Sequence, residues 1–565
     1  MFKKIIFFAF AILLALQCRP VKNEKLTNVN WDFSDTQLQH IYTLQDRQET
    51  DSLIKYFSDP DPTYRYGAAL AFGSYHDKKA IDGLSNLLSD EVADVRIAAA
   101  YALGQIGDDS AEPLLIDAFQ DTTIKTDKIR SAILEAIGKS GSKQSLKNLA
   151  TVSTFLRRDT TLLEGQAWGI YRFALRGKVL PEGTSRMVDF IARKGYPQSV
   201  RQIAANYLGR AEGIELDSMA TLSLSKAFSQ STDVNVRMAL ASALGKTKSE
   251  VALNALTNRY MIEKDYRVKC NILRAYGKFD YYTIEPLVLE AIKDKNLNVS
   301  FTAAKFLVAN GNSRSANVYW KMAKDTALHW QTQLGLYKAA NKYLPPYFEV
   351  TKGQINRELK NRLTTVDSDY EKAAVLDALS QYPWNYRFIK DQSFDLSNSI
   401  VRTASVEALA SVVRNPNFVK FFGTTGSKKV KNELKDYFIE AIEKRDVAMM
   451  AIATGVLREP NLGFKELIDS LDFLEKAQEK LSLPKEMETF PWRGHLGLRL
   501  LEQVIPIINN SKTTLLFTNT RSQCEIWFQK ILEKHPEYAG EIAMHHGSIN
   551  KETRVWVENA IRNES

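Results

Sequence analysis

A short phrase that returns along the chain constrains its fold more than any other feature of the sequence. The phrase is a Val-Arg step, an Ala-rich stretch and then Ala-Leu-Gly, and it is clearest at residues 94–104 and 236–245. Looser copies occupy residues 65–73, 130–138, 201–209, 269–277 and 402–410. Neighbouring copies lie 31 to 36 residues apart, or a multiple of that where copies have decayed. This period predicts an all-α fold, an α-solenoid of stacked helix pairs.

Each copy has the pattern of a helix with one apolar stripe. In residues 94–104 the apolar side chains recur at helical spacing, so one stripe faces inward. We expect Asp94 to cap the start of this helix and Gly104 to take the left-handed conformation at its end. The side chains that we expect to be buried between layers are Val95, Leu103, Val236, Leu244, Val401 and Leu409.

The arginine of the phrase lies in the first helical turn, where the helix dipole disfavours a cation, so its repetition indicates a specific use. The phrase resembles the HEAT-repeat family, in its bacterial lyase-like variety. The resemblance implies a binding surface rather than a catalyst, and a ladder of Asp and Arg that links successive repeats. On this resemblance the ladder residues are Asp94, Arg96, Arg130, Arg201, Asp233, Arg237 and Arg402. Lys269 and Ser300 depart from the pattern, so we expect a weaker ladder there.

The resemblance covers residues 51–415, about eleven units. Weaker copies at residues 166–174, 331–339 and 372–380 fill the gaps between the clear ones. We expect residues 416–487 to form a C-terminal helical cap, because terminal repeats need a polar outer face. Within them, residues 430–444 and 447–457 have helical patterns without the phrase.

The N-terminus predicts export. Two lysines precede twelve apolar residues, 5–16, which are too few to span a bilayer, so residues 1–17 are predicted to be a signal peptide. Cys18 directly follows and resembles the acylated cysteine of bacterial lipoproteins, although Gln17 departs from the small residue usual there. This resemblance implies lipidation at Cys18 and a place in the bacterial cell envelope, on the periplasmic side of a membrane. An ordinary secretory signal is the alternative, and residues 18–50 are predicted to be a linker and a first helix.

The last part of the chain, residues 488–565, has a different pattern. A β-prone run at 514–519, an amphipathic stretch at 521–533 and a short run at 542–544 predict a piece of α/β sheet. Residues 488–497, 516–523 and 545–548 resemble the second RecA-type domain of superfamily 2 DNA helicases of the large helicase-related group, some of them ligase-associated. The resemblance implies nucleic-acid contacts at Thr518, Asn519, Thr520, Arg521, His546, Gly547 and Ser548.

The parts needed for ATP hydrolysis are not recognisable in the sequence. It contains no Gly-x-x-x-x-Gly-Lys-Ser/Thr loop for phosphates and no Asp-Glu-x-His box for magnesium. Export also conflicts with the cytosolic work of a DNA helicase. We therefore expect a truncated RecA-like segment joined near residues 483–490 as a passenger, with no catalytic residues and no cofactor.

The net charge and the spacing of the cysteines exclude few classes of function. The net charge of +9 comes from 75 basic and 66 acidic residues that are mostly interspersed, and it does not by itself indicate a nucleic-acid partner. Apart from Cys18, the cysteines are Cys270 and Cys524, which have neither the spacing of a metal site nor that of a disulfide framework. We expect no metal site.

The leading hypothesis is a non-catalytic, lipid-anchored HEAT scaffold that binds a protein partner in a helical groove. One alternative rests on residues 473–484, which resemble the end of exported HEAT proteins that continue into a cyclophilin-type prolyl isomerase. On this alternative the chain is a folding factor whose catalytic domain is absent here. A helicase-derived, nucleic-acid-binding chain without a complete ATPase site is a further alternative, which export disfavours.

Overall fold

The computed structural model describes residues 29, 35–121, 126–345, 347–393, 398–444, 446–468, 474, 501–510, 514, 516, 521–538 and 541–543. Across these residues the regular elements are helices, and none of them is a β-strand. The predicted all-α solenoid is confirmed.

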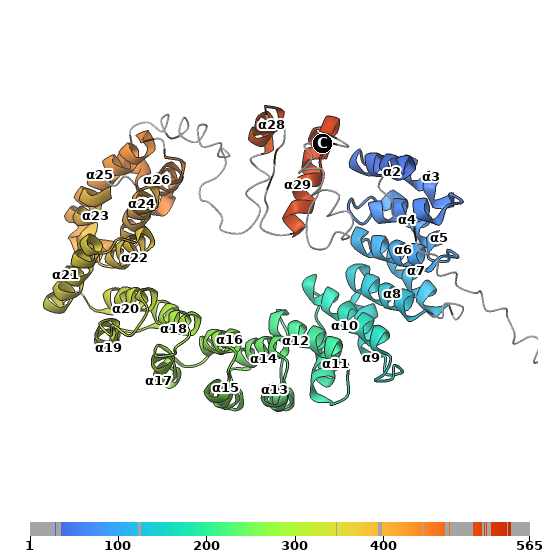
Figure 1. Ribbon diagram of the computed structural model, residues 1–565, viewed down its shortest axis with the longest axis horizontal. Coiled ribbons are helices and arrows are strands. Elements are labelled where there is room, and N and C mark those ends of the chain that lie inside the picture. Colours follow the sequence, from blue (N-terminus) through green and yellow to red (C-terminus); the bar gives the residue numbers. More distant parts are fainter. Residues whose placement is uncertain are drawn as a thin grey trace, which may run out of the picture. The chain divides into compact units, whose positions relative to one another are not determined.

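The helices alternate between two layers, which we call the even layer and the odd layer after their labels (Figure 1). The even helices are α2 (Thr36–Asp46), α4 (Pro62–Ala71), α6 (Ala93–Ile106), α8 (Asp127–Ser140), α10 (Thr160–Leu175), α12 (Gln198–Arg210), α14 (Val234–Thr247), α16 (Tyr266–Tyr276), α18 (Leu297–Asn310), α20 (Trp330–Tyr343), α22 (Asp369–Ser380), α24 (Ser399–Val413) and α26 (Val447–Arg458).

The odd helices are α3 (Thr50–Lys55), α5 (Ile81–Leu87), α7 (Ala111–Gln120), α9 (Lys143–Thr151), α11 (Pro181–Ala192), α13 (Ser218–Gln230), α15 (Glu250–Ile262), α17 (Tyr281–Ala291), α19 (Ala316–Ala323), α21 (Glu349–Thr365), α23 (Tyr386–Ser393) and α25 (Phe418–Glu443). Short 3-10 turns are η1 (Tyr56–Ser58), η2 (Lys78–Ala80), η3 (Pro383–Asn385), η4 (Pro460–Leu462), η5 (Lys465–Leu467) and η7 (Pro536–Tyr538). Every copy of the phrase lies on an even helix.

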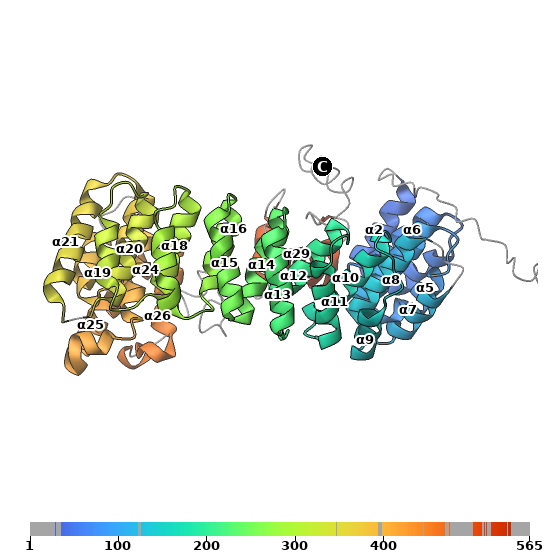
Figure 2. The same ribbon diagram turned by 90° about the horizontal axis from the view of Figure 1, so that it is seen from below.

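The chain divides into two compact units. Unit 1 comprises Met1–Ala243 with Phe517–Ser565, and unit 2 comprises Leu244–Leu516, so the boundary falls inside α14. Within unit 1 the even helices from α2 to α12 pack side by side, and α5, α7, α9 and α11 each pack against an even helix. Within unit 2 the even helices from α16 to α26 pack in the same way, each against its odd partner. Figure 2 shows the helices of each layer from a second side.

The interior of the stack follows the prediction from the phrase. Its six expected core residues, Val95, Leu103, Val236, Leu244, Val401 and Leu409, are all buried. Small alanines such as Ala99 and Ala102 lie beside them and are buried as well. The alternation of small and large apolar side chains therefore fills the space between neighbouring even helices.

The expected roles of Asp94 and Gly104 as helix caps are wrong. Helix α6 begins at Ala93, so Asp94 is its second residue and lies exposed in the first turn. The helix ends at Ile106, and Gly107 takes the left-handed conformation, with φ 68°. Gly104 lies inside the helix, where an added Cβ would come 2.9 Å from the Cα of Ala136 on α8. The glycine of the phrase is thus needed for close approach of the next even helix, not for ending its own.

The described residues beyond α24 are also helical. α25 contains a kink at Gly423, which has a φ of 69°, and it packs against α26 as a further pair. The role of residues 416–487 as a cap stays a prediction. Beyond them lie α28 (Leu501–Asn509) and α29 (Arg521–Lys534).

The α/β pattern expected for residues 488–565 is not found at the residues that can be compared. Helix α29 occupies the predicted amphipathic stretch, but Thr514, Leu516, Ile542 and Ala543 are not in strands. A β-strand needs a hydrogen-bonded neighbour, and the described residues supply none. The other residues of both expected strands lie outside the described residues. No described helix has the length and apolar character required to cross a bilayer.

Candidate functional site

The arginine of the phrase connects the two helices of its own repeat. Arg65 donates through Nη1 to the carbonyl oxygens of Asp59 and Pro60, at 2.7 and 3.1 Å. Arg237 donates through Nη1 to the carbonyls of Ser231 and Thr232, at 3.2 and 2.7 Å. These acceptors lie five and six residues before the arginine, in the turn that enters the even helix. A first-turn arginine therefore satisfies carbonyls that the turn leaves without helical partners.

The residue at this position of the phrase also binds carbonyl oxygens in other copies, including one in which the arginine is replaced by glutamine. Arg96 donates through Nε to the carbonyl of Asp90, six residues earlier. In the weaker copy at 166–174, the amide of Gln166 donates to the carbonyls of Leu149 and Val152, at 2.7 and 2.9 Å. Both side chains are buried. The hydrogen-bonding role explains why the phrase keeps a polar residue in an otherwise apolar helix.

Carboxylates join consecutive repeats, but from a different position than the family resemblance implied. Arg65 forms a two-pronged ion pair with Asp90 of the next repeat, Nε to Oδ2 at 2.8 Å and Nη2 to Oδ1 at 3.0 Å. Lys269 pairs with Asp294, also 25 residues later, at 2.7 Å. Lys269, where we expected a weaker ladder, thus has the same kind of link. At Ser300 the link is a hydroxyl contact of 3.0 Å with Thr332.

The remaining predicted ladder residues have varied surroundings. Arg130 stacks over the Phe119 ring at 4.8 Å, and Arg402 pairs with Asp446 at 3.4 Å. Asp233 accepts from the backbone N–H of Val236 at 2.8 Å, in the first turn of α14. Arg201 is half-buried at the fourth position of α12. Asp94 and Arg96 are not brought together as an ion pair, because Asp94 faces solvent and Arg96 is buried.

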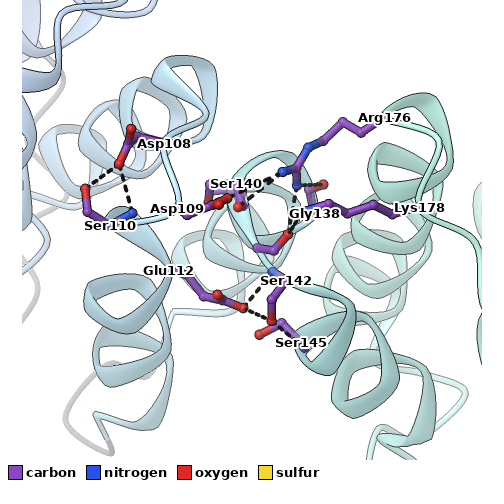
Figure 3. A network of polar contacts seen from close by, with 12 residues as sticks. Asp108, Asp109, Ser110, Glu112, Gly138, Ser140, Ser142, Ser145, Arg176 and Lys178 are labelled. Atoms are coloured by element: carbon purple, nitrogen blue, oxygen red, sulfur yellow. Dashed lines mark hydrogen bonds and ion pairs between the residues drawn. The ribbon is translucent and has the colours of Figure 1, made fainter.

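A second polar network runs through the loops that follow even helices in unit 1 (Figure 3). Glu112, in the first turn of α7, accepts from the backbone N–H and the hydroxyl of Ser142, at 2.8 and 2.7 Å. Ser142 is itself the N-cap of α9. Burial raises the pKa of Glu112, but hydrogen bonds from Ser145 and Ser142 and the charge of Lys178 outweigh it, so the pKa lies below its ordinary value. Glu112 is therefore an ionised link between consecutive odd helices.

Two cations complete this network at the end of α8. Arg176 donates to the carbonyls of Ser140 and Gly141, at 3.3 and 3.0 Å, and Lys178 donates to Gly141 at 2.9 Å (Figure 3). The last carbonyls of a helix carry partial negative charge and lack helical partners. The following repeat thus caps the preceding one, which fixes their relative orientation.

The even layer of unit 1 carries a surface cluster of aromatic and charged side chains, which we call the even-layer cluster. It consists of Tyr101 on α6, Glu135 and Lys139 on α8, and Trp168 and Arg172 on α10. Glu135 lies between two cations, 2.9 Å from Arg172 and 3.4 Å from Lys139. Lys139 lies over the Tyr101 ring at 4.8 Å and Arg172 over the Trp168 ring at 5.0 Å. All five are half-buried, so they are held in place yet reach the surface.

Part of the chain is similar in sequence to a known protein family. Residues 50–138 match the family model described as HEAT repeats. This part of the chain is therefore similar to HEAT repeats. The match covers helices α3 to α8, which include the Arg65–Asp90 link and the first part of the even-layer cluster.

Other similarities are partial. An ATP-dependent helicase, Lhr-Core protein 2 of Thermococcus barophilus, is 30% identical over 96 residues, which are 17% of this chain and 11% of that protein. This chain thus spans about a tenth of the length of this relative.

Among solved structures, the Kap95:Nup1 complex matches with a TM-score of 0.48 at 12% identity, covering 96% of this chain and 83% of that chain. A Kap121p mutant matches with a TM-score of 0.35 at 11% identity, covering 87% and 68%. Human deoxyhypusine hydroxylase matches with a TM-score of 0.23 at 19% identity, covering 53% and 96%.

Unit 2 contains a buried lysine in an asparagine cluster. Lys352 on α21 is 1% exposed, donates to the carbonyl of Asn341 at 3.0 Å and lies over the Tyr382 ring at 4.5 Å. Asn356 exchanges hydrogen bonds with Asn341 at 2.9 and 3.1 Å and accepts from Asn385 at 2.6 Å. Burial lowers the pKa of Lys352 from 10.5 to about 8.

Several predicted sites lie outside the described residues. These are Cys18, Thr518, Asn519, Thr520, His546, Gly547 and Ser548. Arg521 is the first residue of α29, and its side chain is likewise outside the description. Within the described part of the chain, no three His, Cys, Asp or Glu side chains gather as metal ligands would.

Sequence reasoning missed four features of the site: the carboxylates Asp90 and Asp294, the loop network around Glu112, the even-layer cluster and the buried Lys352. Only the two carboxylates had a detectable signal, because Asp90 and Asp294 each lie 25 residues after a basic residue of the phrase. Lys352 had none, since a lysine between polar residues on a helix normally faces solvent.

Proposed function

We propose that this chain is an exported, lipid-anchored HEAT-repeat scaffold that binds a protein partner through the even layer of unit 1 and does not itself catalyse a reaction. The observation that carries the proposal is the even-layer cluster. Tryptophan, tyrosine and arginine are the residues most often found at energetic centres of protein interfaces. Here they lie on consecutive helices of the even layer, Tyr101 on α6 and Trp168 and Arg172 on α10, with Glu135 of α8 between them.

The surroundings of the cluster support binding by a preformed surface. Glu135 and its two cations restrain each other, and the loop network around Glu112 holds the neighbouring repeats in a fixed orientation. Side chains that are already ordered lose less conformational entropy when a partner binds. The arrangement suits a partner with an apolar or aromatic group for Trp168 and Tyr101, and with polar groups for Glu135 and Arg172.

The lipid anchor and the export route rest on the sequence of the N-terminus. Cys18 directly follows the twelve apolar residues of the predicted signal peptide. An acylated Cys18 would hold the stack at a membrane surface, and residues 19–34 would separate it from the lipid. On this proposal the membrane is an anchoring site and the even layer meets the partner.

Affinity capture of the full-length chain from the native membrane fraction tests the proposal. The test variant combines Trp168→Ala with Arg172→Ala. The matched control combines Gln144→Ala with Asn148→Ala, an exposed hydrogen-bonded pair on α9 of the odd layer, 2.9 Å apart. We expect a protein whose recovery falls at least about tenfold with the test variant and is unchanged with the control, a loss of roughly 1.4 kcal/mol or more. If every captured protein is recovered equally with both variants, the even-layer proposal is wrong.

A further inference from the structure

Unit 2 carries a line of exposed apolar side chains that recurs once in every repeat, which we call the apolar stripe. Its members are Val251, Tyr282, Val318, Val350, Trp384 and Val419. Each is the second or third residue of an odd helix or, for Trp384, of the 3-10 turn that precedes one. The elements are α15, α17, α19, α21, the turn η3 before α23, and α25. Their exposed fractions run from 42% for Val318 to 77% for Val350. Because the position is the same in each repeat, the six side chains follow one edge of the unit.

The residue types of the stripe differ from those that are favourable at the start of a helix. The first turn carries partial positive charge, so acidic residues are stabilising there. Three odd helices of unit 1 follow this rule, with Asp82, Glu112 and Glu182 as second residues of α5, α7 and α11, whereas α9 has Gln144 and α13 has the exposed Met219 at this position. Unit 2 instead places valine, tyrosine or tryptophan there, in contact with water. These exposed apolar side chains do not stabilise the helix start and do not fill the core. Their repetition therefore indicates that they contact a binding partner.

Other aromatic side chains widen the stripe at its middle. Tyr347 and Phe348, just before α21, are both exposed, and their rings lie 4.9 Å apart. Trp384 is held against Phe422 of α25, with ring centroids 5.1 Å apart. The centre of the stripe is therefore its most apolar part.

Exposed basic side chains flank four of the six stripe residues. Lys248, Lys278, Arg314 and Lys420 are exposed next to Val251, Tyr282, Val318 and Val419, and none of the four has an ion pair in the described part of unit 2. The acidic residues in the same loops are fewer. Asp280 is occupied as the N-cap of α17, where it accepts from Thr283 at 3.0 Å, and Glu250 and Glu349 remain. An occupant with acidic residues would complement this fringe.

We infer that the apolar stripe binds an extended acidic segment of a partner protein, with one apolar side chain for each repeat. Neighbouring helices of a stack lie roughly 10 Å apart, and an extended chain advances about 3.3 Å per residue, so about three residues cover one repeat. A polyproline II segment has three residues per turn and a rise of about 3.1 Å, so it presents the same face every 9 Å or so. Five steps between six stripe positions thus correspond to a segment of about 15 residues.

A bilayer surface suits the stripe less well. Membrane interfaces favour tryptophan and tyrosine, whereas four of the six stripe residues are valines. The stripe is also separate from the even-layer cluster of unit 1, so the two proposals stand or fall independently.

Fluorescence anisotropy with the full-length chain tests the inference. The probe is a labelled synthetic peptide of five Leu-Glu-Pro triplets, with two control peptides in which either Leu is replaced by Ser or Glu by Lys. We expect binding of the first peptide only. Trp384→Ala combined with Val350→Ser should weaken it at least about tenfold, while Gln144→Ala, at the same helix position in unit 1, should leave it unchanged.

Circular dichroism should show that the stripe variant keeps its helices, since both side chains are exposed. Failure of the Leu-Glu-Pro peptide to bind overturns the inference, as does equal binding to the stripe variant. Stripe-dependent binding to vesicles of anionic lipid, without peptide binding, would also overturn it in favour of a membrane surface. The variant with Trp168→Ala and Arg172→Ala should bind the peptide normally, whichever way the test of the even-layer cluster turns out.

Discussion

Asp90 links two repeats through side-chain contacts that are almost fully withdrawn from water. The side chains of Arg65 and Asp90 are 9% and 7% exposed, and the same carboxylate accepts from the backbone N–H of Val92 at 2.8 Å. The ion pair raises the pKa of Arg65 above its ordinary value, mainly through the hydrogen bond to Asp90. A buried charge whose partner is removed is strongly destabilising.

We predict that Asp90→Ala lowers the free energy of unfolding by about 3 to 5 kcal/mol, because it leaves the buried Arg65 guanidinium with only the exposed Glu91, 3.8 Å away, as an ion-pair partner. Asp94→Ala serves as the control, since Asp94 is exposed in the first turn of α6, and its effect should stay within about 0.5 kcal/mol. Urea unfolding followed by circular dichroism measures both. Equal losses from the two variants would show that Asp90 is not the residue that links the repeats.

The phrase predicted which helices carry the ladder but not which carboxylate pairs with its arginine. Asp94 is close to Arg96 in the sequence, yet residues two apart on a helix point to different sides. The partner of Arg65 comes instead from the turn before the next even helix. Sequence spacing does not show which turn a long side chain reaches, so this part of the site needed the structure.

Lys352 couples the stability of unit 2 to pH. Burial lowers its folded-state pKa from 10.5 to about 8, so between these values the folded state binds fewer protons than the unfolded state. Stability must therefore rise with pH across this window, by no more than about 3 kcal/mol in total.

We predict that the urea midpoint of the wild-type chain rises, relative to that of Lys352→Met, as the pH increases from 8 to 10. All other ionisable groups are present in both proteins, so their effects cancel in the comparison. Midpoints measured at three or four pH values suffice. Parallel pH profiles for the two proteins would mean that Lys352 stays charged in the fold.

At the scale of helices, glycines set how closely the even helices approach. Gly138 on α8 lies against the backbone of Gly169 on α10, and an added Cβ would meet the Gly169 Cα at 2.6 Å. Gly353 on α21 is the opposite case, since an added Cβ would meet no atom within 4 Å. Both glycines lie within helices, so both lower the stability of their own helix, but only Gly138 is needed for close packing. Comparing the two therefore distinguishes the packing effect of glycine from its effect on helix stability.

Gly138→Ala should destabilise unit 1 by about 1 to 3 kcal/mol, because backbone atoms of α10 cannot move aside without disturbing the stack. Gly353→Ala should stabilise unit 2 by roughly 0.5 to 1 kcal/mol, because alanine is the better helix former and finds open space. Thermal unfolding of both variants provides the comparison. A stabilising Gly138→Ala would contradict the close approach of α8 and α10.

The helical period and the buried positions were predictable because both follow from the apolar pattern, which each repeat must satisfy to pack against its neighbours. The functions of the glycines were only half predictable. A glycine near the end of a helix has the same sequence signature whether it ends the helix, as Gly107 does, or admits a neighbouring helix, as Gly104 does. The even-layer cluster was not predicted at all, since Tyr101, Glu135 and Trp168 belong to three different copies of the phrase.

For the whole molecule, the proposed anchor has a direct chemical test. We predict that the mature chain begins at Cys18 and carries acyl chains, each buried methylene adding about 0.8 kcal/mol of membrane affinity. Mass spectrometry of the N-terminal peptide should show the modified cysteine, and Cys18→Ser should move the protein out of the membrane fraction. An unmodified mature protein that begins at another residue would exclude the anchor.

The central claim is that the even layer of unit 1 is the surface that meets a protein partner. Site-specific photo-crosslinking in cells tests it most directly, with the crosslinking residue placed at position 101, 135 or 168 on the even layer, or at 144 or 148 on the odd layer. The account predicts crosslinks to one and the same partner protein from the three even-layer positions and none to it from α9. Crosslinks only from α9, or no crosslinked protein from positions 101, 135 and 168, would contradict it.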